Sequence, residues 1–120
     1  MNFTQLKVWQ KARELRNKVF ALSRGFPPEE RYNLTSQLLS SSRSVTANIA
    51  EGHGHYHHKE NLRYCRMARA SLSETLDHLI CAFDYHYIQR EDLEKLKNEI
   101  KDTERILNGY MRHLVKQKTV

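Results

Sequence analysis

The sequence predicts an all-α protein, an up-down-up-down antiparallel four-helix bundle that forms a single domain over residues 1–120. Apolar residues recur at spacings of three and four in four separate stretches, which is the pattern of a helix with one buried face. Only 4 Gly and 2 Pro interrupt the chain, and no stretch alternates apolar and polar residues as a strand does. The connections between the four stretches are short, which favours antiparallel neighbours.

The first predicted helix covers about residues 5–24. One face is an apolar seam, and the opposite face is basic, because Glu14 is the only acidic residue before position 27. A solvated face usually mixes charge signs, so this one is a candidate for binding an anionic partner, with simple solvation as the alternative. The seam comprises Val8, Ala12, Leu15, Val19 and Leu22, and the basic face comprises Lys7, Lys11, Arg13, Arg16 and Lys18.

Pro27 and Pro28 separate the first helix from the second, which is predicted over about residues 34–51. Asn33 precedes it and is expected to be its N-cap, accepting a hydrogen bond from a free backbone amide. The middle of this helix, Ser40–Ser44, is small and polar. Small side chains allow another helix to approach closely, so this stretch is predicted to be a packing face or a contact between subunits.

The end of the second helix has an unusual composition. Gly52 and Gly54 can adopt a positive φ, which predicts a helix C-terminus here. Glu51 stands at the negative end of the helix dipole, which is unfavourable without a partner. Asn48 falls on the apolar seam and is expected to bond a neighbouring backbone or helix. We interpret Asn48, Glu51, Gly52 and Gly54 as the structural corner between the second and third helices.

Four of the seven histidines lie within residues 53–58. Structural zinc sites use fixed spacings, mostly with cysteine, and no such spacing is present. We therefore expect a polar loop and no metal site, with contact to a phosphate backbone as a possible role for the loop.

The third helix is predicted over about residues 59–85. Its first half carries a basic stripe of Lys59, Arg63 and Arg66, and acidic residues follow in its second half, at Glu74, Asp77 and Asp84. This polarity favours a directional electrostatic contact, with local pairing to neighbouring helices as the alternative. Arg69 interrupts the apolar seam, and this break, together with Tyr56 and Tyr64, is a sequence indication of contacts between subunits.

The fourth helix is predicted over about residues 91–115, where the apolar seam is the most regular in the chain. Acidic residues in its first turn and basic residues near its end suit the helix dipole. Residues 116–120 are expected to fray. The seam comprises Leu93, Leu96, Ile100, Thr103, Leu107, Tyr110 and Leu114.

Composition narrows the class of function. The net charge is +6 and the isoelectric point is near 9.5, which favours anionic partners such as nucleic acid. No apolar run is long enough for a membrane span, and the N-terminus lacks the pattern of a signal peptide. Cys65 and Cys81 are expected on one helix, roughly 24 Å apart, too far to form a disulfide, which suggests a cytoplasmic setting.

Motifs for catalysis are missing from the sequence. There is no phosphate-binding glycine loop and no zinc-protease motif. The Glu-x-x-His pairs of di-iron bundles are also missing, since Glu74 stands four residues before His78. We therefore expect no enzymatic activity and no cofactor.

Several motifs occur in an order that resembles one family. They are Val8-Trp9-Gln10-Lys11-Ala12, Phe26-Pro27, Tyr32-x-Leu34-Thr35-Ser36-Gln37-Leu38, Asn48-Ile49-Ala50-Glu51-Gly52-x-Gly54 and Ala68-Arg69-Ala70-Ser71-Leu72-x-Glu74. Together they resemble the four-helix bundle family of 23S rRNA intervening-sequence proteins, whose superfamily includes the accessory variability determinant of diversity-generating retroelements. The resemblance covers nearly the whole chain.

The resemblance implies a bacterial homo-oligomer, commonly a pentamer. Genes of one branch lie inside intervening sequences of 23S rRNA genes. The retroelement branch is thought to engage a reverse transcriptase and its RNA through a basic surface. This chain departs from the family at Leu39 and Ser40, where basic residues are usual, at His55, where a basic residue is common, and at Thr46, where proline is common. Arg43 partly replaces the lost charge.

We therefore expect a non-enzymatic, basic homo-oligomer that binds nucleic acid, most simply RNA, through its phosphates and without base-specific readout. The alternative is a protein-interaction scaffold or adaptor with no nucleic-acid role, in which the acidic half of the third helix matters more. The predicted nucleic-acid-binding residues are Lys7, Lys11, Arg13, Arg16, Lys18, Arg43, Lys59, Arg63 and Arg66.

Overall fold

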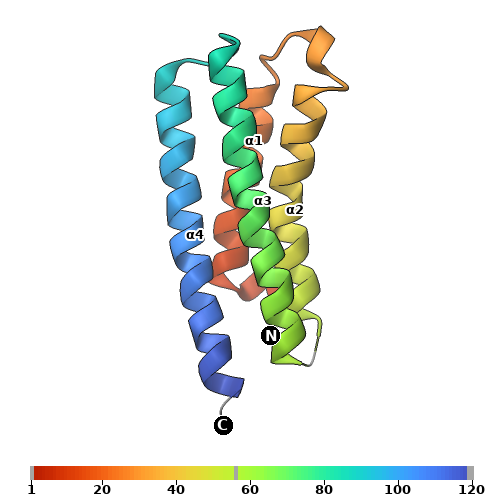
Figure 1. The fold of residues 1–120 in the computed structure, drawn as a ribbon, viewed down its shortest axis with the longest axis vertical. Coiled ribbons are helices and arrows are strands. Elements are labelled where there is room, and N and C mark those ends of the chain that lie inside the picture. Colours follow the sequence, from red (N-terminus) through yellow and green to blue (C-terminus); the bar gives the residue numbers. More distant parts are fainter. Residues whose placement is uncertain (1, 56, 119–120) are drawn as a thin grey trace.

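A computed structural model describes residues 2–55 and 57–118, with the backbone alone at position 118. Within these residues the protein is all-helical and forms an antiparallel four-helix bundle, which confirms the predicted fold class (Figure 1). The elements are the short 3-10 helices η1 (Phe3–Gln5) and η2 (Pro28–Glu30) and the long helices α1 (Lys7–Ser23), α2 (Leu34–His53), α3 (His58–Asp84) and α4 (Arg90–Lys118).

Each long helix packs against two others. α1 and α3 both contact α2 and α4, whereas α1 and α3 stand at opposite corners and do not pack on each other in the described part of the chain. Figure 1 shows α1 behind α3 in an elongated bundle of 51 × 24 × 20 Å. A surface that combines side chains of α1 and α3 would therefore have to extend across α2 or α4.

The predicted apolar seams form the core between the four helices. Leu15 of α1, Leu38 of α2, Leu72 of α3 and Leu107 of α4 are all essentially inaccessible to solvent. Burial of each such side chain stabilises the folded state by about 1.5–3 kcal/mol. None of the helices in the described residues is long and apolar enough to cross a membrane.

The ends of α1 and α4 differ from the predicted limits. α1 begins at Lys7 because residues before it form η1, whose N-cap Asn2 accepts a hydrogen bond from the Thr4 amide at 2.9 Å. α4 continues to Lys118, three residues past the predicted end. Basic side chains in its last turns suit the negative end of the helix dipole. Of residues 116–120, for which fraying was predicted, positions 116–118 are helical, and positions 119–120 lie outside the described part of the chain.

The N-cap predicted for α2 is wrong in its chemistry. Asn33 occupies the cap position, but its side chain makes no cap hydrogen bond and instead donates weakly to the Glu29 carbonyl at 3.5 Å. The Glu30 carboxylate accepts from the Leu34 amide at 3.3 Å and from the Tyr87 hydroxyl at 2.8 Å. η2 positions the Glu30 carboxylate so that it caps the first amide of α2 and also binds Tyr87 in the turn between α3 and α4.

The reason predicted for the glycines of the α2–α3 corner is also wrong. α2 runs through Gly52 to His53, and Gly54 has a φ of −71°. None of the described glycines has a positive φ. The left-handed position is instead His86, with a φ of 66°, in the turn between α3 and α4. Gly52 is needed for space, because a Cβ there would lie 2.7 Å from the Asn61 Oδ1 atom.

Candidate nucleic-acid interface

The small polar side chains of α2 point toward α3. Ser41 Oγ and Thr75 Oγ1 share a buried hydrogen bond of 2.9 Å, and Ser71 Oγ donates to Ser44 Oγ at 3.0 Å. Asn48 Nδ2 donates to both the carbonyl and the hydroxyl oxygen of Ser44, each at 2.9 Å. This stretch of α2 is therefore a packing face within the chain, one of the two alternatives predicted for it.

The α2–α3 corner is a second polar cluster. Asn61 is buried opposite Gly52, and its Nδ2 donates to Tyr110 Oη of α4 at 3.1 Å. Burial raises the pKa of Tyr110, which keeps its hydroxyl protonated at neutral pH. Glu51 is exposed, and no ion pair involves it in the described residues. The close approach of Gly52 and Asn61 thus explains the glycine at this corner, whereas nothing in the structure explains the carboxylate of Glu51 at the end of α2.

Two of the predicted phosphate-binding cations on α1 are paired inside the protein. Lys11 Nζ lies 3.1 Å from Glu99 Oε2 of α4, and Lys18 Nζ lies 2.9 Å from Glu99 Oε1. The hydrogen bond from Lys18, followed by that from Lys11, lowers the pKa of Glu99 despite its partial burial, and the bond to Glu99 raises the pKa of Lys11. One carboxylate therefore holds two of the five cations of this face and offsets one of their positive charges.

The remaining cations of α1 and α2 are spread out. Arg16 Nη1 donates to Thr46 Oγ1 at 3.2 Å, and together with Arg43 it lines a small hollow of about 160 Å³ between the two helices. The Arg13 guanidinium lies over the Trp9 ring, 5.7 Å from its centroid. Lys7 is exposed at the start of α1. Lys7 lies on the side of α1 that faces α4, whereas Arg16 and Arg43 lie where α1 faces α2, so these residues form no compact cluster.

The basic stripe of α3 lies on a different corner of the bundle. Arg63 pairs with Glu60 at 3.2 Å and covers the Tyr64 ring at 5.1 Å from its centroid. His55 stacks on the same ring at 5.3 Å, so Tyr64 is half-buried between its neighbours. Lys59 is exposed. Tyr56, predicted with Tyr64 as a contact between subunits, lies outside the described residues.

A groove between α3 and α4 brings the end of this stripe together with further cations. It has a volume of about 630 Å³ and lies near the C-terminal end of α4. Leu62, Met111 and Val115 give it an apolar floor, and basic side chains stand on both edges. We call it the α3–α4 groove, and the described residues that line it are Leu62, Arg66, Arg69, Asn108, Met111, Arg112, Val115 and Lys116.

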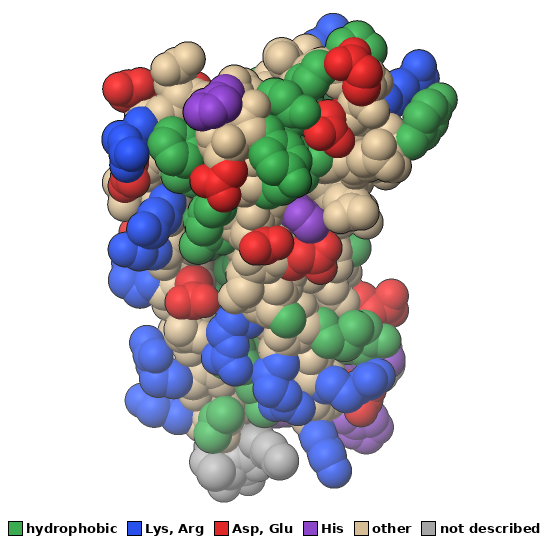
Figure 2. All heavy atoms as spheres, turned by 45° about the horizontal axis from the view of Figure 1, so that its top comes forward, with side chains coloured by type: hydrophobic (Ala, Val, Ile, Leu, Met, Phe, Trp, Pro, Cys, Tyr) green, Lys and Arg blue, Asp and Glu red, His purple; other side chains and the backbone are tan. Residues whose placement is uncertain are grey.

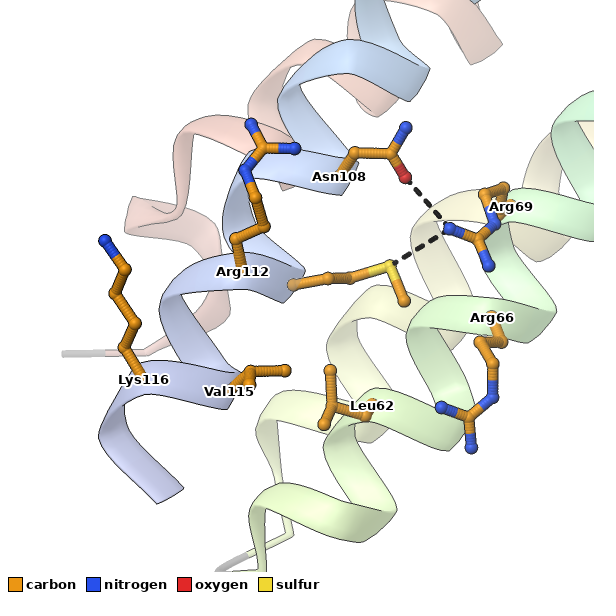
Figure 3. A pocket seen from close by; sticks show the side chains of 8 residues that line it. Leu62, Arg66, Arg69, Asn108, Arg112, Val115 and Lys116 are labelled. Atoms are coloured by element: carbon orange, nitrogen blue, oxygen red, sulfur yellow. Dashed lines mark hydrogen bonds between the residues drawn. The ribbon is translucent and has the colours of Figure 1, made fainter. Parts of the chain in front are cut away.

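The side chains of the α3–α4 groove are partly held in place (Figure 3). Arg69 reaches across from α3, and its Nη1 donates to Asn108 Oδ1 at 3.0 Å and to Met111 Sδ at 3.8 Å. Leu62 and Val115 face each other lower in the groove. The contact of Arg69 with α4 explains why this charged residue interrupts the seam of α3.

Basic side chains dominate the groove, since four of the described lining residues are Lys or Arg and none is Asp or Glu. The helix dipole accounts for Arg112 and Lys116, which stand in the last turns of α4. It does not account for Arg66 and Arg69, which lie in the first half of α3, away from that helix's C-terminus. In Figure 2 the basic side chains gather mostly over the lower part of the visible face and the acidic ones mostly above them.

The structure brings Arg66 into this groove and leaves the predicted residues of α1 on another side of the bundle. Sequence reasoning did not assign Arg69, Arg112 or Lys116 to the site. A signal for Arg69 was present, since a charge on an apolar seam needs a polar or anionic partner. No signal of that kind marked Arg112, whose position fits an ordinary helix end.

Groups that could support other chemistry are few in the described residues. No cluster of three or more His, Cys, Asp or Glu side chains is arranged there to hold a metal ion. Cys65 is buried and Cys81 is half-buried, and both are free thiols on α3.

The fold and the groove define a class of protein, a small antiparallel four-helix bundle with a basic groove between its last two helices. The chain also matches the family model of the 23S rRNA-intervening sequence protein over residues 4–109. It therefore belongs to the 23S rRNA-intervening sequence protein family, as the sequence motifs predicted.

A solved structure shares the fold. It is a protein of unknown function of the S23 ribosomal protein family from Bacteroides thetaiotaomicron, 23% identical in sequence, with a TM-score of 0.79. The match covers 87% of this chain and 97% of that one. A comparison with curated proteins found no match.

Proposed function

We propose that this protein is a non-enzymatic, homo-oligomeric RNA-binding bundle of the cytoplasm, which holds the RNA backbone by its phosphates. The observation that carries the proposal is the α3–α4 groove, where basic side chains of both helices line the wall and none of the described lining residues is acidic. Arg66 and Arg112 both line this groove, and neither forms an ion pair with a described carboxylate, so the two can neutralise successive phosphates. By contrast, Lys11 and Lys18 already share Glu99, so they contribute less net attraction to an anion.

Membership of the family supports an assembly of several copies, for which the resemblance of the motifs implies five subunits. A ring of identical grooves would convert weak phosphate contacts into useful avidity. A reverse transcriptase is the protein partner that the same resemblance implies, and it is the first to test in a pull-down.

The test is binding of the tag-free, full-length protein to a fluorescently labelled structured RNA across a salt series, with light scattering on the same sample. We expect micromolar or tighter binding, and log affinity that falls linearly with log salt concentration, by roughly 0.7–0.9 per phosphate neutralised. Arg66→Gln and Arg112→Gln should each lower both the affinity and this slope.

Two matched substitutions serve as controls. Lys101→Gln removes one exposed cation of α4 outside the groove, and Lys11→Gln removes one that is paired with Glu99. Both should leave affinity nearly unchanged. A larger effect of Lys11→Gln than of Arg66→Gln would move the site to α1, and no binding at low salt by a clean oligomer would refute the proposal.

A protein scaffold is the second candidate. Ile80 is 41% exposed on α3 and lies on the same stripe as Glu74, Asp77 and Asp84, which is suited to a basic partner with an apolar contact. Loss of partner binding in Asp77→Asn, with RNA binding unchanged, would favour this function over the first.

A further inference from the structure

The floor of the α3–α4 groove is apolar, although its edges are basic. Val115 is 49% exposed, and Leu62 and Met111 are only partly buried against the core. Phosphate binding alone does not need these side chains, because a phosphate gains nothing from contact with a leucine or a valine. An occupant that matches the whole groove carries negative charge on its outside and a flat apolar face on its inside.

We propose that the α3–α4 groove holds an unpaired nucleotide of single-stranded RNA, with its phosphates at the basic edges and its base over Leu62 and Val115. This inference rests on the RNA-binding function proposed above. A duplex presents its phosphates outward and keeps its bases stacked inside, so it would leave the apolar floor uncovered. An unstacked base brings an apolar face that can cover it, and bases held by proteins stack on apolar side chains and on guanidinium planes.

The groove is too poor in free polar groups to read the identity of a base. Asn108 is the only uncharged polar side chain among the described residues that line it, and its Oδ1 atom already accepts the hydrogen bond from Arg69. Reading a base takes donors and acceptors at fixed positions, as when Arg binds guanine or Asn binds adenine. Arg69 and Asn108 already bond each other, and the proposal places Arg66 and Arg112 on phosphates. The groove therefore tolerates any unpaired base, and the structural state of the RNA decides binding.

The experiment compares three labelled probes with the full-length protein at one salt concentration. They are a short single-stranded RNA, the same strand annealed to its complement, and the same strand with abasic positions. The abasic strand keeps the phosphates and loses the bases. We expect it to bind about ten-fold more weakly than the intact strand, and the duplex to bind no better than the abasic strand.

A substitution assigns the effect to this groove. Val115→Thr keeps the shape and the β-branching of the side chain but makes the floor polar, and position 115 is exposed enough to accept it. We expect it to lower the affinity for the intact strand several-fold while the salt slope stays as it is. Ile80→Thr also replaces a β-branched aliphatic side chain with threonine, at a similarly exposed site of α3 outside the groove, and should have no effect. A thermal melt of each variant checks that both remain folded.

Each outcome separates the two proposals. If no RNA binds at low salt, the proposed function fails, and this inference fails with it. If the intact strand, the abasic strand and the duplex bind equally, and Arg66→Gln still weakens them, the function stands and the unpaired nucleotide is refuted. If Val115→Thr changes the number of subunits in light scattering, the floor is covered by a second copy of the chain, which also refutes it.

Discussion

Gly52 of α2 and Asn61 of α3 lie so close that no side chain fits between them. A Cβ at position 52 would lie 2.7 Å from Asn61 Oδ1, 2.9 Å from Tyr64 Cβ and 3.1 Å from the Asn61 carbonyl oxygen. One of these atoms is backbone and another is a Cβ, so neither can move away without moving α3. The close approach also positions Asn61 to donate to Tyr110 Oη, which links three helices at one end of the bundle.

We therefore expect Gly52→Ala to reduce the free energy of unfolding by about 1–3 kcal/mol, the usual cost of overpacking. Gly109→Ala is the matched control, because a Cβ there would meet only the flexible end of Arg112, at 3.6 Å. Alanine should stabilise this helix position by about 0.5–1 kcal/mol. Urea unfolding of both variants measures the difference, and equal shifts would show that the close approach is not a constraint.

The buried hydroxyl pair of Ser41 and Thr75 should act as a unit. Ser41→Ala and Thr75→Val together are expected to cost less than the sum of the two single changes, with a coupling energy of about 0.5–1 kcal/mol. A double-mutant cycle in urea measures it. Ser42 and Thr103 are the control pair, since each bonds a carbonyl of its own helix and neither bonds the other. Additive costs at Ser41 and Thr75 would contradict the shared hydrogen bond.

Glu99 should make stability depend on pH in the acidic range. Its pKa is lowered by the hydrogen bond from Lys18 and then by Lys11, so its stabilisation is complete above the ordinary glutamate value. That stabilisation is lost as the pH falls through the lowered pKa of the folded state. Glu99→Gln should cost about 0.5–1 kcal/mol near neutral pH, and this difference should shrink as the pH falls.

Unfolding by urea at several pH values checks this expectation. Glu104→Gln is the control, because no ion pair involves Glu104 in the described residues of α4. A constant difference between Glu99→Gln and the wild type at every pH would show that the carboxylate gains nothing from its two lysines.

The two cysteines should differ in reactivity. Burial raises the pKa of the Cys65 thiol to about 11, so little of the reactive thiolate exists at neutral pH. Cys81 is only half-buried and should be alkylated first in the native protein. Mass spectrometry after iodoacetamide treatment distinguishes the two sites, and in urea both should react. Labelling of Cys65 as fast as Cys81 in the native protein would contradict this packing.

The helices could be predicted because their signals are local. The apolar spacing of Val8, Ala12 and Leu15 is a property of neighbouring positions, and each of these residues is buried in the structure. The cap of α2 was mispredicted because Asn33 has the right side chain at the right position, whereas Glu30 is brought to the same amide by the turn of η2. Capping propensity says which side chains are able to bond a free helix amide, and the path of the chain decides which of them reaches it.

The candidate site could be predicted only in part for the same reason. Net charge and the stripe that ends at Arg66 indicated an anionic partner. Which cations form ion pairs within the protein depends on contacts between segments far apart in the sequence, such as that of Lys11 with Glu99. The role of Gly52 could not be predicted either, because the sequence does not distinguish a glycine needed for close packing from a glycine needed for a positive φ.

The order of residues alone was enough to establish four helices, their antiparallel connection, the family and the basic character of the chain. Periodicity, charge and short motifs are all present before folding. Only packing brought Lys11 and Lys18 of α1 to Glu99 of α4, and only packing placed Arg66 and Arg112 in one groove. Electrostatic attraction and apolar contact act over a few ångströms in space, and only folding brings α3 and α4 within that distance of each other.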